Sequence, residues 1–213
     1  MKNELVSIIE KYEMGGGFER KYLSNGMEIG WGTDKNSTHS FCDFYEKHFS
    51  PYKNKEISIL EIGCNYGCSA IMWHDFLPKS KLLLLDIREA LNPKCWDIKD
   101  NNRFKYAICD AYDEDTPENV INLFPEGFDI IIDDGPHTLE SQKKCIEYYF
   151  PMLKKGGTLC IEDVQNYKDF EHLEEELKSD FRDNINNFSI EKIDLRDIKN
   201  RYDDLIFVVN RIQ

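Results

Sequence analysis

The stretch LEIGCNYGCS, residues 60–69, decides the fold that this sequence predicts. It follows an apolar run at 57–62 and leads into a segment that reads as a helix. Gly63 and Gly67 allow a tight turn and a close approach of the backbone to a ligand, and the first turn of a helix offers free N–H groups. A strand, a glycine loop and a helix in this order are typical of a ligand-binding α/β fold, although the same junction also occurs for packing reasons alone.

Outward from this loop, short apolar runs alternate with amphipathic segments. Several runs are apolar throughout, as expected for strands of a parallel sheet with helices on both faces. The predicted strands are 57–62, 81–87, 104–109, 128–133, 158–163, 188–193 and 204–210. Helices are predicted at 138–153, closed by the glycines of KKGG at 154–157, and at 168–183. The alternation predicts a doubly wound, open α/β sheet.

The first 50 residues differ in pattern and are predicted to form an N-terminal helical extension or lid ahead of a sheet domain at 51–213. An amphipathic helix opens the chain, and GWGTDKNS has the composition of a loop. The stretch THSFCDFYEKHF (38–49) predicts a helix capped by Ser37 or Thr38. Because 50 residues give a poor independent core, we expect the extension to fold onto the sheet domain and to shape either a ligand pocket or a subunit contact.

Composition limits the partners and the location. The chain has 27 basic and 40 acidic residues, a net charge of −13 that repels nucleic acid and anionic membranes. It contains no apolar run long enough to span a bilayer, and its N-terminus is not that of a signal peptide. Seven cysteines without C-x-x-C spacing indicate a reducing compartment. We therefore expect a cytoplasmic protein without nucleic-acid, membrane or zinc partners.

Acidic residues follow the strands next to the glycine loop. Asp86 ends the second predicted strand, where a carboxylate can accept the hydroxyls of a ribose, and Asp110 ends the third. The loop has G-x-x-x-G spacing with Glu61 before it, whereas dinucleotide sites favour G-x-G-x-x-G. An acid at that point suits a positively charged cofactor better than a pyrophosphate. Each aspartate can equally be a helix cap or a loop residue.

Three more carboxylates meet at the same edge of the sheet. Asp134, Glu162 and Asp163 follow two strands that should be neighbours, so their repulsion calls for a positive charge. Ligation by oxygen alone favours a hard cation such as Mg²⁺. His137, three residues past Asp134, can take a proton near neutral pH. The alternative is structural: a strand end with a helix cap, and a capping role for His137.

Together these motifs resemble those of class I S-adenosylmethionine-dependent methyltransferases, over roughly residues 30–210. Within that class the chain is similar to a subgroup of metal-dependent sugar O-methyltransferases, which includes the macrolide-sugar enzymes of the mycinamicin and tylosin pathways. The matching stretches are WGTDKNSTH (31–39), EIGCNYGCSAIMW (61–73), DDGPH (133–137) and IEDVQ (161–165). Pro136 departs from the subgroup, in which small polar residues are usual, and should stiffen the turn without removing a ligand.

The resemblance implies a Rossmann-like α/β fold, with a doubly wound, seven-stranded, mostly parallel sheet whose last strand is antiparallel. It implies S-adenosyl-L-methionine and Mg²⁺ as cofactors, and methyl transfer to a hydroxyl of a small-molecule acceptor, a sugar or glycoside. Asp134, Glu162 and Asp163 would hold the metal, and His137, with Asp134, would be catalytic as the general base. The implied cofactor-binding residues are Thr33, Lys35, Glu61, Gly63, Asn65, Tyr66, Gly67, Ser69, Asp86, Ile87, Asp110, Ala111 and Asp133.

Three other functions stay open at this stage. A methyltransferase acting on a catechol or another small diol would use the same metal chemistry, and only an acceptor screen separates it. An NAD-type oxidoreductase is disfavoured by the loop spacing. A non-catalytic nucleotide-binding protein has no need of three mutually repelling carboxylates. The sequence is compatible with a homo-oligomer and does not identify the acceptor or the methylated position.

Overall fold

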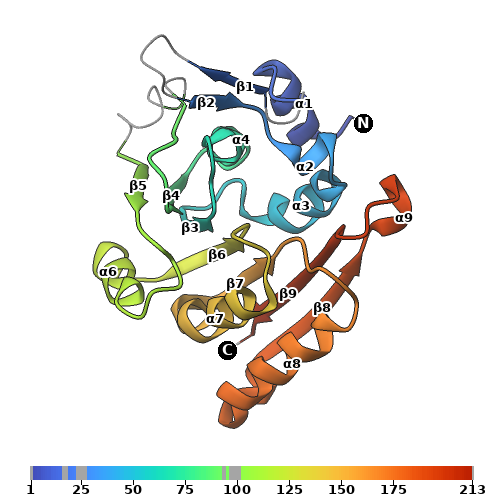
Figure 1. Ribbon diagram of the computed structural model, residues 1–213. Coiled ribbons are helices and arrows are strands. Elements are labelled where there is room, and N and C mark those ends of the chain that lie inside the picture. The colour runs from blue at the N-terminus through green and yellow to red at the C-terminus, as the bar shows by residue number, and fades with distance from the viewer. Residues whose placement is uncertain (1, 16–18, 23–27, 93–94, 96–101, 213) are drawn as a thin grey trace.

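A seven-stranded sheet forms the centre of the computed structural model, which describes residues 2–15, 19–22, 28–92, 95 and 102–212 (Figure 1). The strands are β3 (Ile57–Ile62), β4 (Ser80–Asp86), β5 (Phe104–Ile108), β6 (Phe128–Asp133), β7 (Leu153–Ile161), β8 (Phe188–Asp194) and β9 (Leu205–Arg211). Their spatial order is β5-β4-β3-β6-β7-β9-β8. Strands β3 to β7 pair in parallel, whereas β9 lies antiparallel between β7 and β8. The prediction of a doubly wound, mostly parallel sheet with an antiparallel last strand is confirmed.

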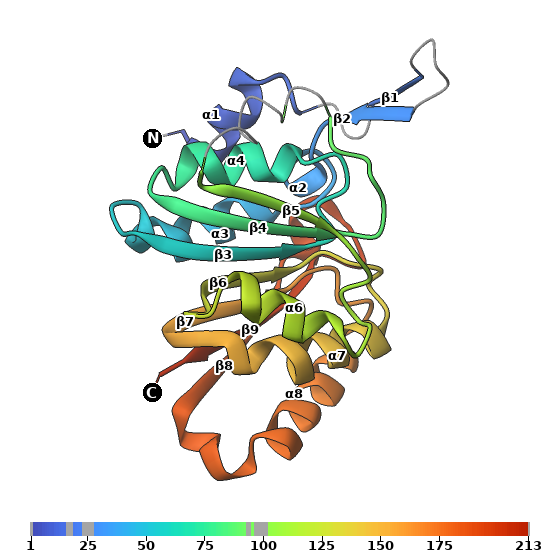
Figure 2. The same ribbon diagram turned by 90° about the vertical axis from the view of Figure 1, so that its left-hand side faces the viewer.

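Helices cover both faces of this sheet (Figure 2). The helices are α1 (Glu4–Lys11), α2 (Asp34–Ser37), α3 (Phe41–Phe49), α4 (Cys68–Phe76), α6 (Thr116–Leu123), α7 (Leu139–Tyr149), α8 (Asp169–Asp180) and α9 (Arg196–Lys199), with short 3₁₀ turns η1 (Ser50–Tyr52), η3 (Phe150–Met152) and η4 (Arg182–Asn187). Successive residues of a central strand point to opposite faces. Ile59 of β3 therefore packs with α1, α3 and α4, while the next residue, Leu60, packs with α7 and α8. This two-sided burial explains why the central strands are mostly apolar.

The N-terminal segment shares the core of the sheet. Leu5 of α1 and Phe41 of α3 belong to the same buried cluster as Ile59 and Trp73 of α4. The segment also contains an antiparallel hairpin, β1 (Glu19–Tyr22) and β2 (Glu28–Trp31), which a purely helical extension did not predict. The division into two domains at residue 50 stays a prediction.

The predicted C-terminal end of the helix at 138–153 is wrong. Helix α7 ends at Tyr149, and a 3₁₀ turn containing Pro151 separates it from β7. Proline restricts the residue before it and cannot donate the backbone hydrogen bond that a continuing helix needs. The KKGG stretch consequently lies inside β7, which ends at Ile161 and leaves Glu162 and Asp163 in the following loop.

The capping residues predicted for α3 are also wrong. Ser40 stands at its N-cap, because the preceding residues form the extra turn α2. Thr33 caps α2, where its hydroxyl accepts a hydrogen bond from the backbone N–H of Lys35. The segment predicted as a loop thus holds a helical turn that fixes the direction of Lys35.

The described part of the chain holds no helix that is both long and apolar enough to cross a membrane. All seven cysteines are free thiols, and all but Cys109 are buried. Buried thiols of this kind pack as small apolar side chains.

Candidate functional site

A pocket of about 480 Å³ opens at the carboxyl edge of the parallel strands. Its walls come from the loops after β3, β4, β5 and β6, which lie side by side in the sheet. The lining residues are Asp34, Ile62, Gly63, Asn65, Leu85, Asp86, Ile87, Arg88, Cys109, Asp110, Ala111, Tyr112, Asp134, Gly135, Pro136 and His137. The strand order reverses at β3, because β4 follows on one side of it and β6 lies on the other. Doubly wound folds bind their ligands at this switch point, and the pocket lies there. Its volume is in the range of cofactor sites.

The glycine loop after β3 forms one wall of the pocket. Its first residue has to be a glycine, because the loop passes close to the backbone after β6 there. Gly63 has φ +82°, and a Cβ there would lie 2.0 Å from the backbone oxygen of Asp134. Asn65 also has a positive φ of 48°. The carboxylate of Asp86 accepts hydrogen bonds from the backbone N–H of Asn65 at 2.8 Å and of Arg88 at 3.0 Å. Asp86 therefore holds the loop in place while it lines the pocket.

The predicted cofactor residues divide into two groups. Six of them line the pocket: Gly63, Asn65, Asp86, Ile87, Asp110 and Ala111. The other seven do not line it: Thr33, Lys35, Glu61, Tyr66, Gly67, Ser69 and Asp133. Tyr66, predicted to contact the ligand, is 4% exposed and packs against Gly30. A direct contact with the cofactor stays a prediction for all thirteen residues, and the pocket lining includes six of them.

Glu61 is a buried carboxylate behind the glycine loop. It accepts hydrogen bonds from Ser69 Oγ at 2.9 Å and from Trp73 Nε1 at 3.2 Å, both on α4. Burial raises its pKa from the usual 4.5 to about 7, against the opposing effect of Lys35, whose Nζ lies 4.0 Å away. Glu61 thus ties α4 to β3 directly behind the pocket wall.

Glu61→Gln should flatten the dependence of stability on pH. Because the folded-state pKa of Glu61 is raised, the stability that its neutral form provides is complete below about 4.5 and is lost as pH rises through about 7. A glutamine does not titrate and has no such loss. The difference in unfolding free energy, variant minus wild type, should therefore be roughly 2–3 kcal/mol larger at pH 8.5 than at pH 5. Urea unfolding across this range measures the difference. Parallel pH profiles for the two proteins would show that Glu61 titrates as in the unfolded chain.

Tyr112 is a wall residue that the sequence did not single out. Its hydroxyl donates to Asp133 Oδ1, which also accepts from the backbone N–H of Gly135. Burial raises the pKa of Asp133 to about 7, against the effect of these hydrogen bonds. Asp133 therefore positions Tyr112 from behind the wall. The signal was present in the sequence, since Tyr112 follows Asp110 by two residues at a strand end.

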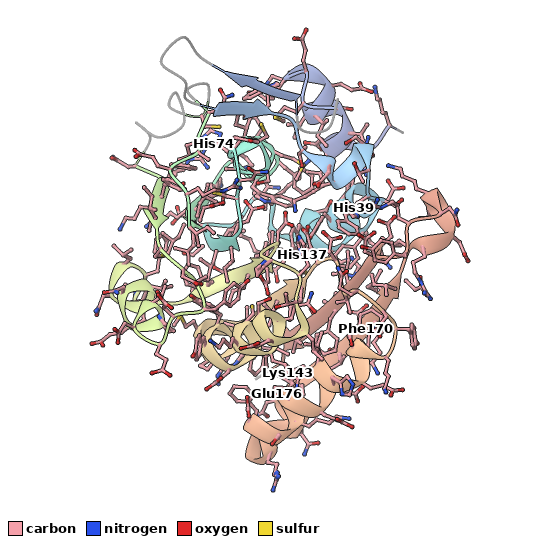
Figure 3. The ribbon with its side chains drawn as sticks, in the orientation of Figure 1. His39, His74, His137, Lys143, Phe170 and Glu176 are labelled. Atoms are coloured by element: carbon pink, nitrogen blue, oxygen red, sulfur yellow. The ribbon has the colours of Figure 1, made fainter. Side chains whose placement is uncertain are left out.

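Asp134, Asp163 and His137 meet at the rim of the pocket (Figure 3 labels His137). His137 Nε2 lies 3.7 Å from Asp134 Oδ1 and 3.6 Å from Asp163 Oδ2. His137 and Asp163 both have positive φ, 57° and 52°, a conformation that side-chain-bearing residues seldom adopt. Backbone strain of this kind gathers at functional sites. The structure thus brings together two of the three predicted metal ligands and the predicted base.

Glu162, the third predicted metal ligand, is held by other partners. Both of its oxygens accept hydrogen bonds from Lys35 Nζ, at 2.7 and 2.6 Å, and Oε1 also accepts one from Tyr45. Burial raises the pKa of Glu162 to about 8, although the ammonium of Lys35 opposes the rise. Nothing in the sequence pattern indicated these two partners, because both come from the N-terminal segment.

Asp163 connects the rim to a second histidine, His39, between α2 and α3 (Figure 3). His39 Nδ1 lies 2.7 Å from Asp204 Oδ1 and 3.2 Å from Asp163 Oδ1. Within the described residues, this buried Oδ1 of Asp163 has no hydrogen-bond partner. Burial, reinforced by the charges of Asp134 and Glu162, raises the pKa of Asp163 to about 10. A buried carboxylate without enough positive charge is what a cation would stabilise, so the oxygen donors at this rim fit a hard divalent ion.

Comparison with known proteins connects this site to one family. Residues 53–206 match the family model described as a methyltransferase domain. The chain is 29% identical over 133 residues to mycinamicin VI 2''-O-methyltransferase of Micromonospora griseorubida, covering 59% of this chain and 32% of the relative. It is 30% identical over 141 residues to demethylmacrocin O-methyltransferase of Streptomyces fradiae, covering 63% and 33%. The match thus spans about a third of the length of these curated relatives.

Solved structures share the fold across almost the entire chain. MycE methyltransferase from the mycinamycin biosynthetic pathway, in complex with Mg and SAH, superposes with a TM-score of 0.69 at 19% identity. Its complex with Mg, SAH and mycinamycin VI gives 0.68 at 20% identity. Each covers 99% of this chain and 55% of the other. At this identity the likeness establishes the fold.

Proposed function

The chain belongs to the methyltransferase domain family that its residues 53–206 match, and on that premise we propose that it transfers a methyl group from S-adenosylmethionine to a hydroxyl of a sugar or glycoside. The curated relatives support the acceptor class, since two of them are named as O-methyltransferases of a rhamnosyl tetracenomycin and of an olivosyl-oleandolide. The observation that carries the proposal is the meeting of His137 with Asp134 and Asp163 at the rim of the glycine-loop pocket.

The pocket residues suit the cofactor. Asp86 and Asp110 place carboxylates at the ends of β4 and β5, where they can accept hydrogen bonds from the hydroxyls and amino groups of a nucleoside. Ile87, which is 67% exposed, offers an apolar surface beside them for a base. The six predicted cofactor residues of the lining come from three adjacent loops, so one ligand can contact them all.

The rim residues suit the chemistry of hydroxyl methylation. When bound, S-adenosylmethionine supplies an electrophilic methyl group, and Mg²⁺ lowers the pKa of an adjacent hydroxyl. Asp134, Glu162 and Asp163 are the residues that would hold the ion. His137 Nε2 would accept the hydroxyl proton, because it lies at the rim and its side chain is 31% exposed. The loop from Asp134 to His137 links both tasks, since it forms part of the pocket lining.

Binding of S-adenosylhomocysteine tests the cofactor assignment directly. Calorimetry should show a Kd of about 1 μM for this product, with and without Mg²⁺, and no heat with NAD. A clear NAD signal, or silence with S-adenosylhomocysteine, would reject the proposed function. The NAD-type oxidoreductase and the non-catalytic protein predicted as alternatives lose their support with the family assignment.

The acceptor needs a separate measurement. A screen of free sugars, glycosides and catechols, with mass spectrometry of the product, distinguishes the proposed acceptors from the small diols of the alternative. A cytoplasmic location and a homo-oligomeric state stay predictions, and size-exclusion chromatography with light scattering measures the second.

A further inference from the structure

The carboxylates proposed to hold the metal, Asp134, Glu162 and Asp163, form an acidic cluster. The ammonium group of Lys35 lies inside this cluster, between Asp134 and Glu162. Its Nζ is 2.8 Å from Asp134 Oδ2 and 2.6 and 2.7 Å from the two oxygens of Glu162. The side chain is 1% exposed. Burial opposes its charge, but Asp134 and Glu162 outweigh that effect and raise the pKa of Lys35 well above its usual value. Lys35 is therefore a buried cation in direct contact with both carboxylates.

The fold delivers this side chain from far away in the sequence. Lys35 is on the single turn α2, whose start is fixed by the Thr33 cap. Asp134 and Glu162 follow 99 and 127 residues later, after β6 and β7. Strands β6 and β7 are neighbours, so their two carboxylates form a pair that α2 faces. The contacts of Lys35 thus join three separate parts of the chain: α2, the loop after β6 and the loop after β7.

The ammonium of Lys35 and a divalent ion would compete for the same carboxylate oxygens. A divalent ion takes oxygen ligands at about 2.0–2.6 Å, and the lysine already occupies one oxygen of Asp134 and both oxygens of Glu162. An ion bound there would also lie within a few ångströms of the ammonium, where like charges repel strongly in a site shielded from water. Without either cation, the buried carboxylates would be uncompensated.

We infer that Lys35 is the resident cation of this cluster in the metal-free protein, and that a divalent ion binds by displacing its ammonium from Asp134 and Glu162. The inference rests on the proposed function only in taking a divalent ion as the ligand. Lys35 is then a positioning residue: it keeps the two carboxylates at one place in the apo protein and sets how tightly the ion binds. The competing arrangement leaves Lys35 on Glu162 and gives the ion only Asp134, Asp163 and His137.

Replacement of Lys35 by methionine tests the exchange. Mn²⁺ binding at pH 8, followed by the electron paramagnetic resonance of the free ion, should be at least about ten-fold tighter in Lys35→Met than in the wild type, because the competing charge is gone. Mg²⁺ should also raise the melting temperature of the variant more than that of the wild type, since its carboxylates depend on the ion alone. Equal or weaker Mn²⁺ binding by the folded variant would overturn the inference.

Lys199→Met is the matched control. Lys199 has the same charge and lies near the same segment, but it donates to the backbone oxygens of Asn36 and His39 and not to the cluster. Its Mn²⁺ affinity should equal that of the wild type. An equal gain in both variants would mean that net charge alone controls the affinity, and would overturn the exchange.

A measurement on the wild type covers the case in which Lys35→Met does not fold. Buried lysine ammonium groups exchange their protons slowly, so the Lys35 ¹⁵NH₃⁺ resonance, assigned by its loss in Lys35→Arg, should be visible without metal. Saturating Mg²⁺ should remove or shift it. A resonance unchanged by Mg²⁺ would support the competing arrangement and overturn the inference. Calorimetry with S-adenosylhomocysteine on the same samples separates this failure from a failure of the proposed function.

Discussion

Replacing His137 by alanine is expected to lower kcat for methyl transfer by about 10²- to 10⁴-fold, the usual contribution of a positioned general base. The side chain lies at the pocket rim with Nε2 near both Asp134 and Asp163, so it is placed to receive a proton from a hydroxyl held there. Binding of S-adenosylhomocysteine should be nearly unchanged. Steady-state kinetics with the identified acceptor, together with calorimetry, measures both quantities.

The same geometry permits a different role, because His137 Nε2 could itself be a metal ligand. Mn²⁺ affinity distinguishes the two roles: it should be nearly unchanged in His137→Ala if the residue is a base, and much weaker if it is a ligand. His172→Ala, on the outer helix α8, is the control and should behave as the wild type. Turnover close to that of the wild type in His137→Ala would refute the assignment.

Gly63→Ala is expected to destabilise the protein by about 3 kcal/mol or more and to weaken S-adenosylhomocysteine binding by at least about 100-fold. The added Cβ would lie 2.0 Å from the backbone oxygen of Asp134, so either the glycine loop or the loop after β6 has to move. Both loops line the pocket, and the second carries the rim carboxylate. Urea unfolding and calorimetry measure the two effects.

Gly156→Ala separates the collision from the backbone strain. Gly156 has φ +77°, close to the +82° of Gly63, but a Cβ there would meet nothing within 4 Å. This variant should cost only the strain of a left-handed alanine, about 1–2 kcal/mol, and should bind S-adenosylhomocysteine normally. Equal losses in the two variants would show that strain alone explains the effect at Gly63.

Much of the fold was predictable, because strands that are buried on both faces of the sheet have a simple sequence pattern, a run of apolar residues. Strands β3, β4, β5 and β6 are apolar runs that end in loops, and their predicted bounds differ from the observed ones by one residue at most. The pattern failed where local sequence and tertiary context disagree. KKGG has the composition of a helix end, yet it lies within β7, at the irregular stretch between the pairs of Leu153 and Thr158 with β6, once Pro151 has ended α7. The sequences of β1 and β2 contain no apolar run that would predict a strand.

The candidate site divides in the same way. The sequence by itself determined that Asp86, Asp110, Asp134 and His137 share one edge of the sheet, because each follows a strand and parallel strands end together. Only the tertiary structure decided what neutralises that edge. Lys35 and Tyr45 reach Glu162 from helices packed across the sheet, and contacts over more than 100 residues leave no periodic or compositional trace in the chain. A carboxylate's position can be inferred from its own strand, but its counter-charge is set by whichever distant segment folds against it.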